Sequence, residues 1–350
     1  MSLALLLGVV NAACVNLRPP PKVLPREAAG PAPMQVWTAR AGRRLTGQVA
    51  ISQGSLYGAG VDRKVYAVDL QSGRVLWTHR LSGIVAGGVL LTGDTVYAGS
   101  SRPEGRVYAL ERGGGKRIWR STTGPVSAPL AMAGGSLIVA TQPGILVALD
   151  PATGEVRWRR RLGVARVAPL PIGEDAMVVA TVDSLYRLMA SDGSVTHRSA
   201  SPGTLLSPWI TFAGGLVAGT TDSQVVSIRP TDLGLNWSVR VDAPVLGSPA
   251  AAGDTIYAAS RRGTLYRIEP GPPPRAVPIV QLDWPITSAV TIVRNQILLG
   301  GADGTIRALR PDGREIWRLQ VWRPVEVGPL PLEDGILAIG GDGDIHRYRR

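Results

Sequence analysis

The chain has 350 residues, a formal net charge of +12 and a single cysteine, Cys14. One cysteine excludes an intrachain disulfide and also excludes an adjacent cysteine pair. The excess of basic residues is compatible with nucleic acid, anionic lipid or an acidic partner. The arginines are scattered, however, and no nucleic-acid motif accompanies them, so we expect a solvated basic surface and no nucleic-acid partner.

The first fourteen residues predict a targeting segment. The apolar run Leu3–Val10 is too short to span a bilayer and fits the core of a secretory signal. A cysteine directly after Ala12 and Ala13 resembles a bacterial lipobox, although Asn11 and the lack of a positive amino-terminal region depart from it. We predict a signal or lipobox-like segment over residues 1–14 with lipidation at Cys14. The alternatives are a cleaved, soluble periplasmic protein and an unprocessed thiol.

Residues 15–34 are rich in proline and show no apolar alternation. Such segments are extended, at about 3 Å per residue. We predict a tether over residues 15–34, followed by a single repeat domain over residues 35–350. The resemblance to enterobacterial lipoproteins, with no aspartate after Cys14, implies the periplasmic face of the outer membrane.

One phrase recurs along the rest of the chain: an apolar alternating strand, a turn, and a strand that ends on tryptophan. The unit Val126–Leu162 divides into predicted strands over 126–133, 136–142, 145–150 and 155–162. Successive copies lie 38 to 42 residues apart when His197 and Ile279 stand in for tryptophan in two weaker copies. The repeated tryptophans are Trp37, Trp77, Trp119, Trp158, Trp237 and Trp317. A β-rich period of this size is typical of four-stranded propeller blades.

The repeated tryptophan has a predicted structural role. In the best copies it follows a small residue by ten positions, as Trp158 follows Ala148. The small side chain on the third strand leaves room for an indole from the fourth strand. We expect each indole to seal one blade to the next and to have no ligand role.

The pattern A-x-D-x-x-T-G-x-x-x-W is matched in full by Ala148, Asp150, Thr153, Gly154 and Trp158. It resembles the PQQ-like β-propeller repeat family, over nearly all of residues 35–350. Eight inner strands are expected to begin near Gly47, Ile84, Val126, Val167, Leu205, Val245, Ile286 and Val325.

The last of these units is incomplete. It ends on a third strand, at His346–Tyr348, and Met34–Arg40 is a spare fourth strand at the other end of the chain. The predicted fold is therefore an all-β, eight-bladed β-propeller whose ring is closed by the amino-terminal strand.

Quinoprotein alcohol dehydrogenases share this repeat, and the resemblance implies for them a cysteine pair, calcium ligands and a catalytic aspartate. This chain has no cysteine pair and no D-x-D-x-D-G loop, and Gly341–Asp344 reads as a turn. The three histidines His79, His197 and His346 fall in different units, so they do not converge on a metal. We predict no catalytic residue, no cofactor and no metal site.

Several residues outside these patterns stay as candidates. Recurring aspartates precede the third strands, where they serve either as turn residues or as a functional ring: Asp62, Asp183, Asp222, Asp303 and Asp342. The run Arg157–Arg161 is a candidate basic patch. Trp209, Trp284 and Trp322 lie outside the repeat position, where they serve either core packing or a ligand.

The combined features are similar to the BamB family of outer-membrane assembly lipoproteins. The resemblance implies a monomeric, non-catalytic scaffold of the bacterial cell envelope that assists the insertion of outer-membrane β-barrel proteins. It also implies that a BamA-like barrel subunit binds loops between blades in the first half of the ring. The alternatives are a ligand-binding or sensory propeller that uses its channel as a pocket and, less favoured, a quinoprotein dehydrogenase.

Overall fold

The computed structural model describes residues 31–350 except residues 46, 102–103 and 322. The predicted signal segment with Cys14, and residues 15–30 of the predicted tether, lie outside these residues. All the regular elements in the described part of the chain are β-strands. Third strands such as Ile145–Leu149 are built from aliphatic and small residues and are almost wholly buried, because both faces of each sheet are covered by neighbouring sheets.

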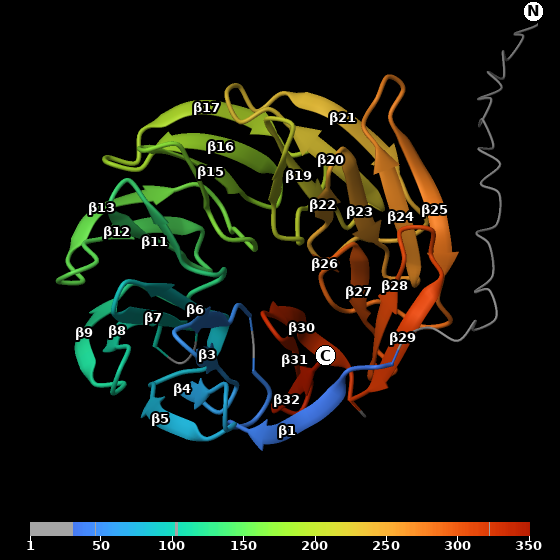
Figure 1. Cartoon of the computed structure of the whole chain (residues 1–350). Helices are drawn as coiled ribbons and strands as arrows, with labels where there is room; N and C mark the ends of the chain where they lie inside the picture. Colours follow the sequence, from blue (N-terminus) through green and yellow to red (C-terminus); the bar gives the residue numbers. More distant parts are fainter. Residues whose placement is uncertain (1–30, 46, 102–103, 322) are drawn as a thin grey trace, which may run out of the picture.

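The strands form eight antiparallel sheets of four strands each, arranged as the blades of a closed ring (Figure 1). Blade 1 comprises β2 (Ala50–Ser52), β3 (Ser55–Ala59), β4 (Lys64–Asp69) and β5 (Val75–Arg80), and blade 2 comprises β6 (Val85–Thr92), β7 (Thr95–Ser100), β8 (Arg106–Glu111) and β9 (Arg117–Thr122). Blade 3 comprises β10 (Ala131–Ala133), β11 (Ser136–Ala140), β12 (Ile145–Leu149) and β13 (Val156–Arg161), and blade 4 comprises β14 (Leu170–Ile172), β15 (Ala176–Ala180), β16 (Ser184–Met189) and β17 (Val195–Ala200). Blade 5 comprises β18 (Ile210–Phe212), β19 (Gly215–Gly219), β20 (Gln224–Ile228) and β21 (Leu235–Arg240), and blade 6 comprises β22 (Ala250–Ala252), β23 (Thr255–Ala259), β24 (Thr264–Glu269) and β25 (Arg275–Gln281). Blade 7 comprises β26 (Thr291–Val293), β27 (Gln296–Gly300), β28 (Thr305–Leu309) and β29 (Glu315–Gln320), and blade 8 comprises β30 (Val325–Leu332), β31 (Gly335–Gly340), β32 (Asp344–Arg349) and β1 (Met34–Arg40).

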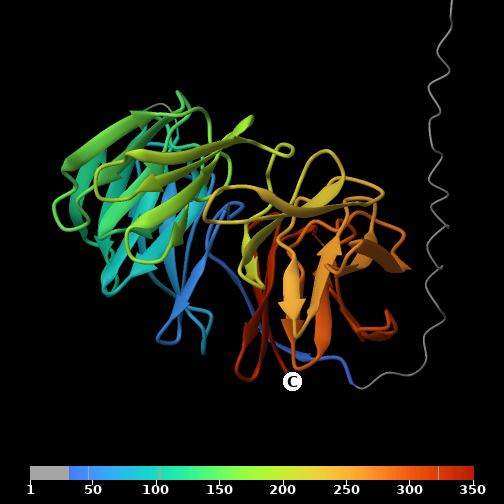
Figure 2. The same cartoon turned by 90° about the horizontal axis from the view of Figure 1, so that it is seen from above.

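The predicted eight-bladed propeller and its closure by the amino-terminal strand are confirmed. β1 pairs antiparallel with β32, so blade 8 is built from both ends of the described chain. Arg40 binds the Asp344 carboxylate through Nε at 2.7 Å and Nη2 at 3.2 Å, and Thr38 Oγ1 lies 3.0 Å from His346 Nδ1. Figure 2 shows the blue amino-terminal strand beside the red carboxy-terminal strands.

Six of the eight inner strands have only three residues, whereas β6 and β30 have eight. In blade 3 the expected strand over residues 126–133 is reduced to β10, with an isolated bridge from Val126 to Thr141. Pro129 lies between the bridge and the strand, and proline has no backbone N–H for the ladder.

Five of the six repeated indoles lie opposite a small residue, as Trp158 pairs with Ala148 between β13 and β12, whereas Trp37 lies opposite Arg347. A bulge follows directly, between Ala148 and Leu149, and it accommodates the ten-residue spacing. The indole also reaches the next blade, where Trp158 Nε1 donates to the Ala190 carbonyl at 2.8 Å. The same bond joins Trp37 to Leu70, Trp77 to Arg112 and Trp119 to Pro151, at 3.1, 2.9 and 2.9 Å.

The junction between blades 7 and 8 differs from these four. In these four junctions the accepting carbonyl lies in the turn between the third and fourth strands of the next blade. Blade 8 has no such turn, since its third strand is β32 and its fourth is β1. Trp317 is buried, with 4% of its surface exposed. Because the turn is missing, its Nε1 has no acceptor among the described residues.

Deletion of residues 31–42 should destabilise the whole ring, because it removes β1, its ladder to β32 and the Trp37 seal. Loss of the half-buried Trp37 indole together with the ladder is expected to cost about 3–5 kcal/mol or more, so the melting temperature should fall by roughly 10 °C or more. Circular dichroism melting of this variant is compared with a control that lacks only residues 1–30. A truncated protein that melts within about two degrees of the control would contradict the closure.

Two glycines separate the effect of the indole from that of backbone strain. Gly154 and Gly135 both have positive φ, 76° and 68°, but a Cβ on Gly154 would lie 2.5 Å from the Trp119 ring whereas a Cβ on Gly135 meets no atom within 4 Å. We expect Gly135→Ala to cost about 1 kcal/mol and Gly154→Ala roughly 3 kcal/mol in urea denaturation. Equal costs would mean that the indole contact adds nothing at this junction.

Candidate functional site

The up-and-down order of the strands sorts the connections onto two faces. Loops between blades and turns between second and third strands share one face, which we call the loop face. The turns that hold the blade seals lie on the opposite face. Binding residues on a rigid scaffold usually lie on its loops, so the loop face is the candidate binding surface.

A cavity of about 560 Å³ opens along the axis of the ring, and we call it the axial funnel. Its walls come from interblade loops and the beginnings of inner strands in every blade except blade 2. The lining is mainly aliphatic and small, and includes Leu170, Leu206 and Leu246 together with the ring of Trp209.

Arg166 is the one charged residue in the described lining of the axial funnel. It lies in the loop between β13 and β14, and its side chain is exposed. The structure gives its guanidinium no hydrogen bond and no ion pair with the described residues, whereas many of the other arginines are paired. Arg166 is therefore a free cation at an apolar cavity, and nothing in the repeat pattern singled it out.

Exposed apolar side chains also occur on the loop face. Ile84, between blades 1 and 2, is 41% exposed, and Val182, in the turn between β15 and β16, is 49% exposed. The loop after blade 4 packs against that turn, because Ser201 N donates to the Asp183 carbonyl at 2.9 Å. Both apolar side chains belong to the first half of the ring.

Blade 7 departs from a packing arrangement that four other blades share. In those blades a tyrosine lies in the third strand, directly before Ala67, Ala109, Arg187 or Arg267. Its hydroxyl forms a hydrogen bond on the loop face: Tyr66, Tyr108, Tyr186 and Tyr266. Tyr266 is buried beside the Asp242 carboxylate, and these two effects raise its pKa to about 12. In blade 7 the same position, one residue before Ala308, is occupied by Arg307.

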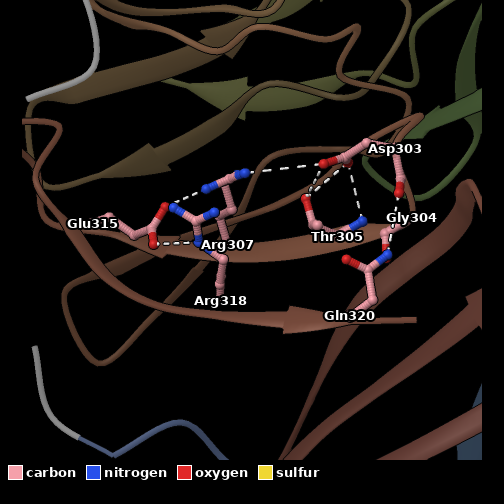
Figure 3. Close-up of polar contacts among 7 residues, drawn as sticks. All are labelled: Asp303, Gly304, Thr305, Arg307, Glu315, Arg318 and Gln320. Carbon is pink, nitrogen blue, oxygen red and sulfur yellow. Dashed lines mark hydrogen bonds and ion pairs between the residues drawn. The ribbon is translucent and has the colours of Figure 1, made fainter. Parts of the chain in front are cut away.

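Arg307 forms a buried charged cluster with neighbours on two strands and one turn (Figure 3). Its side chain is 4% exposed and pairs with Glu315, which is 5% exposed. Arg318 Nε binds the other carboxylate oxygen at 2.8 Å, and Asp303 lies 3.9 Å from Arg307 Nη2. The guanidinium also lies over the Trp284 ring, 4.0 Å from its centroid.

Burial by itself would raise the pKa of Glu315. The hydrogen bond from Arg318 and the charge of Arg307 outweigh burial, so the pKa stays below its ordinary value of 4.5. The Arg307–Glu315 pair is thus ionised at neutral pH and shielded from solvent, whereas the side chains of Arg318 and Asp303 are partly exposed. Its geometry fits a structural clamp within blade 7 better than a site for an external ligand.

The recurring aspartates bind locally at their turns. Asp303 Oδ1 accepts from Thr305 N at 3.0 Å, Asp342 Oδ1 from Asp344 N at 3.3 Å, and Asp183 Oδ1 from Thr181 Oγ1 at 3.0 Å. Asp222 accepts from Thr221, and Asp62 contacts Tyr66. These bonds favour the turn interpretation over a functional ring.

The remaining sequence candidates are spread around the ring. His79, His197 and His346 lie on β5, β17 and β32, and burial lowers the pKa of His79 and of His346. Within residues 31–350 as described, no three histidine, cysteine or acidic side chains are grouped to hold a metal. Trp209 and Trp284 pack against the cores of neighbouring blades, and Trp322 lies outside the described residues.

The Arg157–Arg161 run lies on the outer strand β13 and is partly used within the fold. Arg157 pairs with Asp150, and Arg160 Nε donates to the Gly193 carbonyl of the next blade at 2.9 Å. It does not form one free basic patch. In the part of the chain that the structure describes, no helix has the length and apolarity needed to cross a membrane.

Comparison with known proteins gives one dominant family. A family model described as outer membrane protein assembly factor BamB matches residues 32–102 and 103–232, more than half of the chain. The outer membrane protein assembly factor BamB of Bordetella pertussis is 26% identical over 336 residues, covering 87% of this chain and 85% of that protein. The crystal structure of BamB from Moraxella catarrhalis has the same fold, with a TM-score of 0.76 at 16% identity, over 91% of this chain and 100% of that chain.

A second kind of relative matches only part of the ring in sequence, although the structure of the quinohemoprotein alcohol dehydrogenase from Comamonas testosteroni shares the fold, with a TM-score of 0.73 at 13% identity over 90% of this chain and 76% of that chain. The quinoprotein ethanol dehydrogenase of Pseudomonas putida is 32% identical over 140 residues. The match covers 32% of this chain and 22% of that enzyme. It reflects shared propeller repeats over a minor part of the enzyme.

Replacing Glu315 by glutamine should leave the Arg307 charge buried without its partner. We expect a loss of about 3 kcal/mol in urea denaturation at pH 7, whereas Asp312→Asn, which breaks the exposed pair with Arg314, should cost less than about 1 kcal/mol. The pKa of Glu315 in the folded protein lies below its ordinary value of 4.5. The ionised carboxylate therefore contributes its full stabilisation of the fold above pH 4.5, and this contribution is lost as the pH falls through the pKa of the folded state. The glutamine variant should lack that part of the acid dependence; similar losses in both variants would show that the buried pair is not special.

Proposed function

The chain belongs to the outer membrane protein assembly factor BamB family, and we propose on this basis that it is a non-catalytic scaffold of the bacterial cell envelope that assists assembly of outer-membrane β-barrel proteins. The observation that carries the proposal is the match to this family over most of a closed, eight-bladed ring. A rigid ring with short, hydrogen-bonded turns suits a scaffold, since its binding loops are held in place before a partner arrives.

The proposed partner is a BamA-like barrel subunit, bound by the chain as a monomer. The proposed contact surface is the part of the loop face that carries Ile84 and Val182. These side chains are large, apolar and exposed, and they lie between or at the edges of blades in the first half of the ring. Apolar side chains that become buried at the centre of an interface supply much of its affinity.

The proposed location is the periplasmic face of the outer membrane, through lipid on Cys14 and the proline-rich segment 15–34. The apolar run before Cys14 and the small residues Ala12 and Ala13 support this proposal. Metabolic labelling with a palmitate analogue, compared between the natural protein and Cys14→Ala, measures the lipidation directly.

Binding should depend on the loop face and not on apolar exposure in general. The double variant Ile84→Asp/Val182→Asp is expected to weaken binding to BamA-like periplasmic domains at least tenfold in surface plasmon resonance, with an unchanged melting temperature. The control Leu235→Asp changes a residue that is 48% exposed on the outer strand β21 and should bind normally. Normal binding by the double variant would exclude this surface, and no binding by the natural protein would count against the partner.

A quinoprotein activity is the alternative that the partial Pseudomonas putida match raises. The chain has one cysteine, so it cannot form the adjacent cysteine pair that the resemblance implies for those enzymes. Purified protein supplied with PQQ, calcium, an alcohol and a dye acceptor tests it, and dye reduction above a protein-free control would overturn the non-catalytic proposal.

A further inference from the structure

We propose that the axial funnel is a binding site for a small amphipathic monoanion, an apolar body that carries one carboxylate or sulfonate. The funnel's volume of about 560 Å³ lies within the range of 300–1,000 Å³ that is typical of small-molecule sites. This site is separate from the proposed partner surface at Ile84 and Val182, neither of which lines it.

The charge of the ligand follows from Arg166. A guanidinium binds carboxylate and sulfonate groups through paired hydrogen bonds, and that of Arg166 is not engaged by any described side chain or carbonyl. No described acidic residue lines the funnel to compete with a ligand or to neutralise Arg166. Because only one cation is present, a single negative charge is matched and further charges would be buried against apolar walls.

The body of the ligand follows from the rest of the wall. The apolar surface comes from the Trp209 ring and from Leu170, Leu206, Leu246 and Leu330, and the uncharged polar side chains are Gln48, Ser248, Thr287 and Thr291. Burial of an aliphatic or aromatic body against such a wall is favourable at about 25 cal/mol per Å². A fully polar anion such as inorganic phosphate would leave that surface unused.

The test uses two fluorescent probes that share one ring system and differ by a single charge. These are 1-anilinonaphthalene-8-sulfonate and its uncharged analogue N-phenyl-1-naphthylamine. We expect the natural protein to bind the sulfonate saturably at one site and more tightly than the analogue. Arg166→Gln should weaken the sulfonate about tenfold or more and leave the affinity for the analogue unchanged.

Two further variants make the result specific to the funnel. Arg159→Gln removes an exposed arginine from the outer strand β13 and should bind both probes as the natural protein does. Ala168→Trp adds a bulky ring to the wall beside Arg166 and should abolish binding of both probes, with melting temperatures recorded for every variant.

Three results would overturn the proposal. The first is a sulfonate affinity that Arg166→Gln changes less than twofold. The second is an equal loss in Arg159→Gln, which would assign binding to the general basic surface. The third is the absence of saturable sulfonate binding by the natural protein. A folded Ala168→Trp variant that still binds both probes would likewise place them outside the funnel.

Discussion

The ring depends on the packing of each blade against its neighbours, and at four junctions this packing includes an indole that leaves the fourth strand of one blade and donates to a turn of the next. A single four-stranded sheet cannot bury both of its faces, so each blade is stable only between two neighbours. The bond from Trp158 to the Ala190 carbonyl fixes the relative position of two blades, and the ring face fills the space above a positive-φ glycine, Gly193. Glycine is required there by the backbone conformation and by the indole together.

This constraint explains why closure of the ring takes the form that it does. In a ring that ended on a complete blade, the first and last blades would meet with no strand shared between them. Blade 8 is instead built from β32 and β1, so a ladder of backbone hydrogen bonds joins the two ends of the ring. The split leaves Trp317 without the turn carbonyl that its counterparts use. At the neighbouring junction, between blades 8 and 1, the Leu70 carbonyl accepts from both Arg347 Nη1, at 2.7 Å, and Trp37 Nε1.

The blades are alike in backbone and unlike on the loop face, which is where a scaffold can acquire function without loss of stability. Blade 7 exchanges the repeat tyrosine for Arg307 and encloses its charge with Glu315 and Trp284. The loop before blade 4 carries Arg166, which has no partner among the residues that the structure describes, at the mouth of an apolar funnel. One arginine is therefore used inside a blade and the other is left available, although both are ordinary basic residues in the sequence.

The sequence by itself determined the number of blades, the closing strand and the place of each indole, because these depend on a period of about forty residues and on local alternation that repeat along the chain. The bulge after Ala148, the shortened inner strands and the pairing of Arg307 with Glu315 were decided by the tertiary structure. So was the convergence of Arg166 with side chains from seven blades on one axis. The first three features form within single blades, where the repeat pattern does not mark them. The funnel gathers residues that are distant in the chain and become neighbours only when the ring is closed, so no local pattern could reveal it.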